Sequence, residues 1–154
     1  MADQSEDGGR IVVGVDGSDS SQQALRWAAR YAAATGGVVE AVAAWDIPQF
    51  HGALGWLPPT SGDEKALESE ARRGLERTVE EAVGANPSVE VRVRTEVRYG
   101  TAANVLLQAA NGASLLVVGS RGLGGFKGLV LGSVAQHCVQ QATCPVLVYR
   151  DGDR

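Results

Sequence analysis

Residues 115–134 read LLVVGSRGLGGFKGLVLGSV, and this stretch decides the fold. It begins with four apolar residues, continues through a glycine-rich turn, and ends where Gly132 and Ser133 open a helix-like pattern. A strand that is apolar on both faces belongs in the centre of a parallel sheet. The stretch therefore predicts a buried strand, a turn and a helix, the unit from which parallel α/β sheets are built.

The same alternation of strand and helix runs along the rest of the chain. Residues 11–13 are also apolar on both faces, so we expect the first and fourth strands to be central neighbours. Residues 89–99 alternate apolar with charged side chains, which predicts an edge strand with one face in water. Residues 38–45 and 145–149 supply the second and fifth strands. The prediction is an α/β fold with an open, Rossmann-like sheet of five parallel strands in the order 3-2-1-4-5 and helices on both faces.

Four helices are expected between these strands. The first should begin at Asp19 or Ser20, because each has a glutamine three residues further on, which is the spacing of a capping box. The pair Gly36-Gly37 should end it, since glycine is the common residue after a helix. Ser61 should begin the second helix.

Length and charge limit the class of protein. The chain has 154 residues and a net charge of −4, so we expect one domain over residues 10–150 after an acidic, flexible N-terminus at residues 1–9. A negative charge disfavours binding to nucleic acid or to anionic membranes. The apolar runs are far shorter than the roughly 18 residues that span a bilayer, and the polar N-terminus does not resemble a signal peptide. We therefore expect a cytoplasmic protein without a nucleic-acid or membrane partner.

Two turns follow the two central strands. Residues 14–18 (GVDGS) come after the first strand and residues 119–122 (GSRG) after the fourth. Ligands of open parallel sheets bind beyond the carboxyl ends of the strands, where the strand order reverses. Both turns should therefore face one crevice.

The second turn has the chemistry of a phosphate site. Glycines allow backbone N–H groups to approach a phosphate, and the start of a helix adds further N–H groups and a positive dipole. Arg121 and Lys127 are candidate cations, and Ser133 is a candidate hydroxyl donor or helix cap. The segment is not a P-loop, because Lys127 is not followed by Ser or Thr. The alternative, a flexible glycine linker, explains neither the preceding strand nor the following helix.

These residues resemble the universal stress protein family. The ATP-binding signature of that family is glycine, two residues, glycine, nine residues, glycine, then Ser or Thr. Four residues of this chain match it: Gly119, Gly122, Gly132 and Ser133. The resemblance covers about residues 10–150, apart from the Pro- and Trp-containing loop at residues 46–62.

The resemblance implies that the protein holds ATP, with or without Mg²⁺, between the two turns. Asp16 would contact the ribose or a water bound to a divalent cation; its alternative role is that of a turn residue. Gly14 and Val15 would line the adenine side, and the backbone of Ala44 would face the base. The phosphate side would be formed by residues of the second turn and the last helix: Val118, Gly119, Arg121, Gly122, Gly132, Ser133 and Val134.

Other polar and aromatic residues carry weaker signals. Trp45, Phe50 and Trp56 could stack on a bound base, although aromatic residues at strand ends more often pack locally. His137 is expected on an exposed helix surface and Cys138 in the core, because Cys138 continues the apolar stripe of the last helix.

The sequence favours a binding or signalling module over an enzyme, because no catalytic triad, acid–base pair or metal cluster can be assembled from it. We expect an ATP-binding stress protein that changes its protein partner or its conformation with nucleotide. The alternatives are an ATP-dependent hydrolase or transferase on the same scaffold, with slow ATP hydrolysis as its weakest form, and a cyclic-nucleotide-binding relative.

The last strand predicts a homodimer. Residues 146–149 are apolar on both faces but should lie at an outer edge of the sheet, where exposed apolar strands are an aggregation hazard. Antiparallel pairing with the same strand of a second copy would cover this edge and close the assembly at two chains. The family resemblance implies the same assembly.

Overall fold

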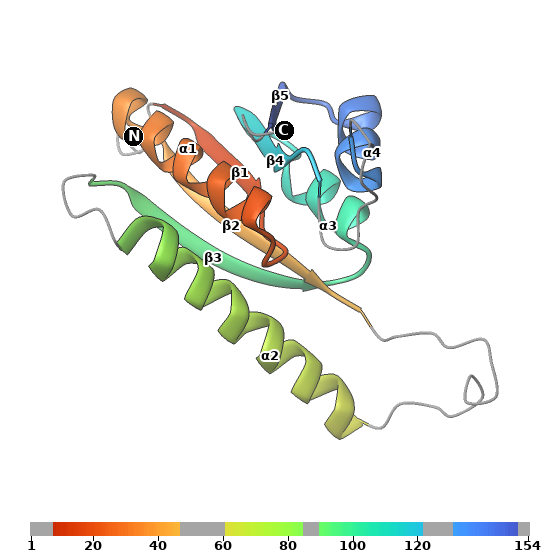
Figure 1. Ribbon diagram of the computed structural model, residues 1–154. Helices are drawn as coiled ribbons and strands as arrows, with labels where there is room; N and C mark the ends of the chain where they lie inside the picture. Colours follow the sequence, from red (N-terminus) through yellow and green to blue (C-terminus); the bar gives the residue numbers. More distant parts are fainter. Residues whose placement is uncertain (1–7, 47–60, 85–89, 122–130, 151–154) are drawn as a thin grey trace, which may run out of the picture.

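The computed structural model describes residues 8–46, 61–84, 90–121 and 131–150 (Figure 1). The strands are β1 (Arg10–Gly14), β2 (Val38–Trp45), β3 (Arg92–Tyr99), β4 (Leu115–Gly119) and β5 (Val146–Tyr149). The helices are α1 (Asp19–Thr35), α2 (Ser61–Val79), α3 (Ala102–Ala109) and α4 (Ser133–Gln141), and a π-helical turn, η2 (Glu80–Gly84), continues α2.

The sheet has the order β3-β2-β1-β4-β5, and every pairing in it is parallel, which confirms the predicted fold class and strand order. The two strands predicted to be central are the most deeply buried. Val12 and Val13 of β1 and Leu116 and Val117 of β4 have no exposed surface. Apolar side chains on both faces of these strands are the physical reason, because only central strands are covered on both sides.

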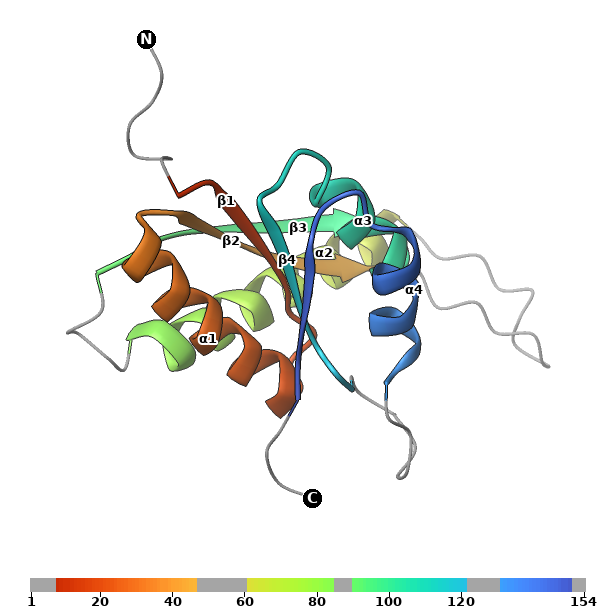
Figure 2. The ribbon, with the colours of Figure 1, turned by 90° about the horizontal axis from the view of Figure 1, so that it is seen from above.

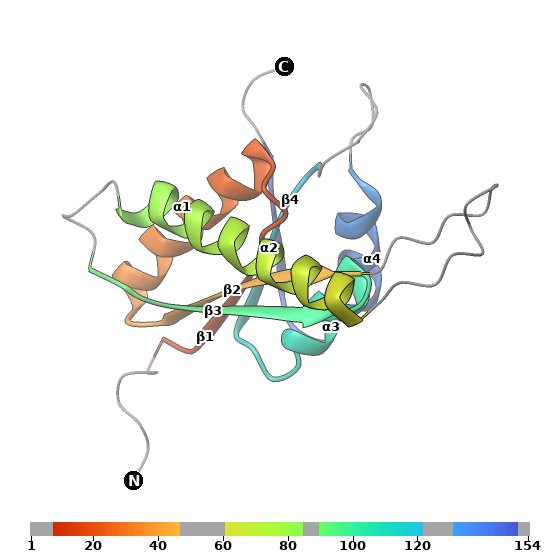
Figure 3. The ribbon, with the colours of Figure 1, turned by 90° about the horizontal axis from the view of Figure 1, so that it is seen from below.

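Helices cover both faces of the sheet. α1 and α2 lie on one face, and α3 and α4 lie on the other (Figures 2 and 3). Side chains alternate between the two layers: Val13 and Val117 pack on the α1/α2 side, whereas Val12 and Val118 pack on the α3/α4 side. Each face therefore has its own apolar core, and the central strands contribute to both.

The predicted N-cap of α1, Asp19 or Ser20, is wrong by one or two residues, whereas the predicted end of the helix is confirmed. Ser18 is the N-cap, and its hydroxyl oxygen accepts a hydrogen bond from the backbone N–H of Ser21 at 3.2 Å. Gly17 precedes it with φ +85°, and Ser18 is then extended, as an N-cap requires, so that Asp19 and Ser20 are already helical. Gly36 ends the helix with φ +81°.

The two edge strands differ in character. On β3, the arginines at 92 and 94 are exposed while Val93 and Val97 pack against the α1/α2 core, which confirms the predicted wet face. All four residues of β5 are partly buried.

α2 is already helical at Ser61, the residue predicted to cap it through Glu64. No helix in the described ranges is both long enough and apolar enough to serve as a membrane span.

Candidate functional site

The turns after β1 and β4 are neighbours at the carboxyl edge of the sheet. Val13 of β1 is paired with Val117 of β4, and both strands end within two residues of this pair. The backbone N–H of Val15 then donates to the carbonyl of Val42 at 2.9 Å, which ties the first turn to β2 as well. The structure therefore brings the two predicted turns together.

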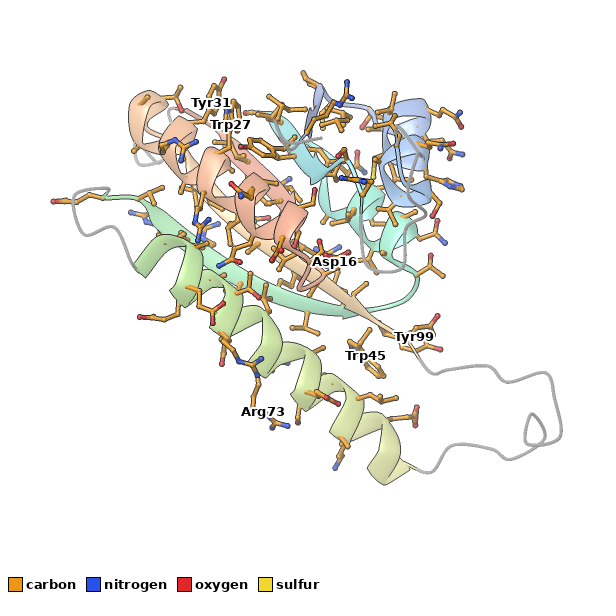
Figure 4. All side chains as sticks on the ribbon, in the orientation of Figure 1. Asp16, Trp27, Tyr31, Trp45, Arg73 and Tyr99 are labelled. Carbon is orange, nitrogen blue, oxygen red and sulfur yellow. The ribbon has the colours of Figure 1, made fainter. Side chains whose placement is uncertain are left out.

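The first turn satisfies its polar groups internally. One carboxylate oxygen of Asp16 accepts hydrogen bonds from the backbone N–H of Ser18 at 2.9 Å and from its hydroxyl at 2.6 Å. The Ser21 hydroxyl donates to the carbonyl of Ser18 at 3.1 Å and accepts from the backbone N–H of Asp16 at 3.3 Å. Asp16 thus has the structural role of a turn residue, while its side chain remains exposed beyond the carboxyl end of β1 (Figure 4).

The second turn is held at both of its described ends. The backbone N–H of Ser120 donates to the carbonyl of Tyr149 on β5 at 2.8 Å, and the carbonyl of Ser120 accepts from Gly132 at 2.6 Å. The side-chain amide of Gln136 donates to the carbonyl of Leu131 at 2.9 Å. These bonds place the end of β4 directly beside the start of α4.

α4 begins without a side-chain cap. Gly132 is the N-cap, with extended φ −73° and ψ 170°, and it has no side chain that could accept from the first turn. The alternative that Ser133 caps the helix is therefore wrong; Ser133 is its first residue and is exposed. Backbone N–H groups of an uncapped first turn attract anions, since the helix dipole also makes this end positive.

All but one of the apolar residues predicted for the site gather on one face. Ala44, Val118 and Val134 belong to the same cluster on the α3/α4 side, and Val118 is 3% exposed. Gly14 also faces that side, because a Cβ atom there would lie 2.6 Å from Cδ1 of Leu106 on α3. Val15 is different: it is buried in the core on the α1/α2 side.

The cations of the second turn are only partly described. Arg121 is exposed at the end of the turn. Gly122 and Lys127 lie outside the described residues.

Within the described part of the chain, no group of three or more His, Cys, Asp or Glu side chains could hold a metal ion.

Sequence reasoning missed one residue beside the site, Ser20 on the first turn of α1. A Cβ atom at Gly119 would collide with the Ser20 hydroxyl oxygen and would lie 3.0 Å from the Cβ and the carbonyl carbon of Ser20. The contact joins positions far apart in the sequence, and no local pattern signals it. The predicted glycine signature therefore begins at a residue that α1 covers.

Trp45 is the one predicted aromatic candidate within the described residues, and it packs locally. Trp45 contacts Tyr99 edge-on, with ring centroids 4.9 Å apart and planes at 66°, at the carboxyl ends of β2 and β3 (Figure 4). Phe50 and Trp56 lie outside the described residues.

His137 is exposed and Cys138 is fully buried, as predicted. Burial, with a smaller effect of the neighbouring Cys144, raises the pKa of the Cys138 thiol to about 11, which makes it a poor nucleophile.

Comparison with known protein families gives a match over nearly the whole chain. The model of the "Universal stress protein family" matches residues 9–150. A universal stress protein of Mycolicibacterium smegmatis is 35% identical over 141 residues, which are 91% of this chain and 45% of that protein. One from Methanocaldococcus jannaschii is 32% identical over 146 residues, which are 92% of this chain and 81% of that protein. The chain spans about half the length of most of the curated relatives it matches.

Solved structures of similar fold include three universal stress proteins. UspA of Lactobacillus plantarum has a TM-score of 0.70 and 22% identity, over 92% of this chain and 97% of that one. A universal stress protein in complex with cAMP has a TM-score of 0.57 and 26% identity, over 92% of this chain and 95% of that one. One from Archaeoglobus fulgidus in complex with dAMP has a TM-score of 0.54 and 21% identity, over 91% and 96%.

Proposed function

Because this chain belongs to the universal stress protein family, we propose that it binds ATP, together with Mg²⁺, between the turns that follow β1 and β4. In this proposal, bound nucleotide changes the protein's conformation or its protein partner, so that it works as a cytoplasmic binding or signalling module in a stress response. Structural neighbours that bind cAMP and dAMP support nucleotide binding in general.

The observation that carries the proposal is the hydrogen bond from Gly132 to the carbonyl of Ser120. It holds an uncapped helix start against the end of a central strand, where open parallel sheets bind their ligands. The first-turn N–H groups of α4 would face the phosphates, and the Ser133 hydroxyl would add a donor. Arg121 would supply a positive charge, as arginines commonly do at phosphate sites.

The base would lie towards β2. The backbone of Ala44 would face it there, with Gly14 beside it at the end of β1. Neighbouring strands are about 4.8 Å apart, so β2 lies about 10 Å from β4. That span suits an extended nucleotide with its phosphates at α4.

Asp16 is the carboxylate we assign to the ribose or to the hydration shell of Mg²⁺. Mg²⁺ is usually held by one or two carboxylates together with substrate phosphates, so the Asp16 carboxylate fits an ion that arrives with the nucleotide. Its existing bonds to Ser18 hold the carboxylate at the carboxyl edge of the sheet.

Isothermal titration of the full-length chain with ATP, with and without Mg²⁺, tests this function. We expect saturable binding with a dissociation constant of millimolar or better, and tighter binding with Mg²⁺. Mass spectrometry of small molecules released on denaturation gives an independent measurement. A chain that neither titrates with ATP nor carries an adenine nucleotide would refute the proposal.

A cyclic or single-phosphate nucleotide is the second candidate, because the two nucleotide-bound neighbours hold cAMP and dAMP. Titration with AMP and cAMP under the same conditions separates the two. ATP binding at least tenfold tighter than either would favour the extended nucleotide, and the reverse order would favour the second candidate.

The last strand supports a homodimer. The carbonyls of Pro145 and Tyr149 accept from Leu116 of β4 and from Ser120 directly after it, so the odd-numbered residues of β5 direct their backbone groups inward. The backbone groups of Val146 and Val148 then point away from the sheet, since direction alternates along a strand. Antiparallel pairing with the same strand of a second copy would satisfy these groups.

Light scattering of the wild type and of Val148→Pro tests the dimer. The proline removes an outward N–H group and leaves the bonds to β4 intact, so we expect a folded monomer. Val148→Thr is the matched control, because it keeps both the N–H group and the branched shape. A wild type that is monomeric at tens of micromolar would exclude this assembly.

A further inference from the structure

The first turn of α1 lies too close to the end of β4 for a side chain at position 119 unless Ser20 moves. A Cβ at residue 119 would collide with the hydroxyl oxygen of Ser20 and would lie 3.0 Å from its Cβ and its carbonyl carbon. Packing therefore favours glycine at 119 independently of any ligand, because only glycine lacks the crowded atom.

Local folding does not explain why Ser20 occupies this position. The start of α1 is already completed by Ser18 and Ser21, which bond to each other and to Asp16. Ser20 is 7% exposed, and its hydroxyl is the one buried side-chain polar group in the described part of the chain without a hydrogen-bond partner. A buried hydroxyl without a hydrogen-bond partner lowers the free energy of unfolding, so the position of Ser20 against Gly119 reduces the stability of the fold.

Gly119 lies where four elements meet. It is paired with Tyr149 of β5, and the next residue, Ser120, is bonded both to Tyr149 and to Gly132 at the start of α4. Ser20 adds α1 to this group from the other face of the sheet. A shift of Gly119 would therefore move the start of the second turn relative to α4.

We propose that Ser20 is a positioning residue for the nucleotide site, because its contact with Gly119 sets where the second turn begins and couples that turn to α1. The inference rests on the proposed function, since it assigns the contact a role in nucleotide affinity. The proposal gives two glycines of the signature different roles. Gly119 allows the close contact with α1, whereas Gly132 lets the backbone approach the phosphates.

A double-mutant cycle tests the coupling, with ATP affinity and thermal unfolding measured on each full-length variant. Gly119→Ala should weaken ATP binding at least tenfold, because its Cβ pushes the turn away from α1. Ser20→Gly should weaken ATP binding about three- to tenfold, because the contact that positions Gly119 is lost. Combining the two removes the contacts with the hydroxyl and Cβ of residue 20, so affinity should return to within about threefold of the wild type.

Gly37→Ala is the matched control at the opposite end of the sheet. A Cβ there would lie 2.9 Å from the carbonyl oxygen of Gly9 and from Cδ1 of Ile11, so the variant carries a comparable packing defect away from both turns. It should lower the thermal midpoint without changing ATP affinity. Loss of affinity in Gly37→Ala equal to that in Gly119→Ala would show general destabilisation and would overturn the positioning role.

Two further results would overturn the inference: wild-type affinity in Gly119→Ala, or a double variant that binds as weakly as Gly119→Ala. A wild type that binds no nucleotide refutes the proposed function and, with it, the role in affinity. The thermal midpoints still decide the contact itself in that case. Recovery of the midpoint in the double variant shows coupling, and no recovery refutes it.

Discussion

The turns after β1 and β4 lie side by side but use their polar groups in opposite ways. In the first turn, Asp16, Ser18 and Ser21 bond to one another and cap α1. In the second turn, Gly132 occupies the cap position of α4 and offers no side chain. A turn that satisfies its own N–H groups stabilises a helix, whereas a turn that leaves them unsatisfied can bind an anion. The comparison thus assigns structure mainly to the first turn and, under the proposed function, phosphate binding mainly to the second.

A bulky residue at the cap of α4 should produce the largest effect. Gly132→Val places a branched side chain where phosphate should meet the backbone, and we expect ATP affinity to fall at least a hundredfold, about 2.7 kcal/mol. The φ of −73° at Gly132 is open to valine, so the fold should persist. Titration calorimetry, with circular dichroism for the fold, provides the measurement.

Gly74→Val is the matched control for this substitution. Gly74 lies on α2, and a Cβ there would have no atom within 4 Å. ATP affinity should stay at the wild-type value. If Gly132→Val bound ATP as tightly as Gly74→Val, the start of α4 would not contact the phosphates, and the proposed difference between the two turns would be refuted.

The next largest effect is expected at Asp16, which belongs to the first turn but is also proposed to contact the nucleotide. Asp16→Ala should weaken ATP binding by about 1–3 kcal/mol and flatten its dependence on Mg²⁺, because a charged hydrogen-bond partner is lost. Asp16→Asn keeps an oxygen that can accept from Ser18 but removes the charge. If Asp16→Asn binds ATP and responds to Mg²⁺ like the wild type, the carboxylate serves only the turn.

The smallest effect is expected at the cap of α1. Ser18→Ala removes the acceptor of the Ser21 N–H and should lower the free energy of unfolding by about 1 kcal/mol. ATP affinity should change less than threefold, because the backbone N–H of residue 18 still holds the Asp16 carboxylate. Urea denaturation and calorimetry on the same samples measure both quantities. A large loss of affinity without a loss of stability would reverse the roles of the two turns.

The fold could be predicted because the decisive signal is local. The apolar runs at residues 11–13 and 115–118 identify the central strands, and the alternating charges at residues 89–99 identify an edge. The cap of α1 could not be predicted by spacing, since residues 16–21 (DGSDSS) offer several candidates. The positive φ of Gly17 selects Ser18 among them, and that dihedral angle is set by the folded turn.

The candidate site was predicted less completely. The sequence located the two turns and the start of α4, because glycines and strand ends mark them. It gave no sign of the contact between Ser20 and Gly119, which depends on how α1 crosses β4 in the folded chain. The prediction also put Gly14 and Val15 on one side of the nucleotide, although alternation along a strand directs neighbouring residues to opposite faces, as the structure shows.

The pairing of β1 with β4 has a consequence for folding kinetics. Ile11 lies opposite Leu115, so the two turns meet only after the chain closes a loop of about a hundred residues. Such non-local pairing slows folding, and before it forms neither turn has its partner. A nucleotide that needs both turns would bind the native state alone and stabilise it in proportion to the logarithm of its concentration. It would therefore slow unfolding, while the rate at which the strands find each other would stay the same.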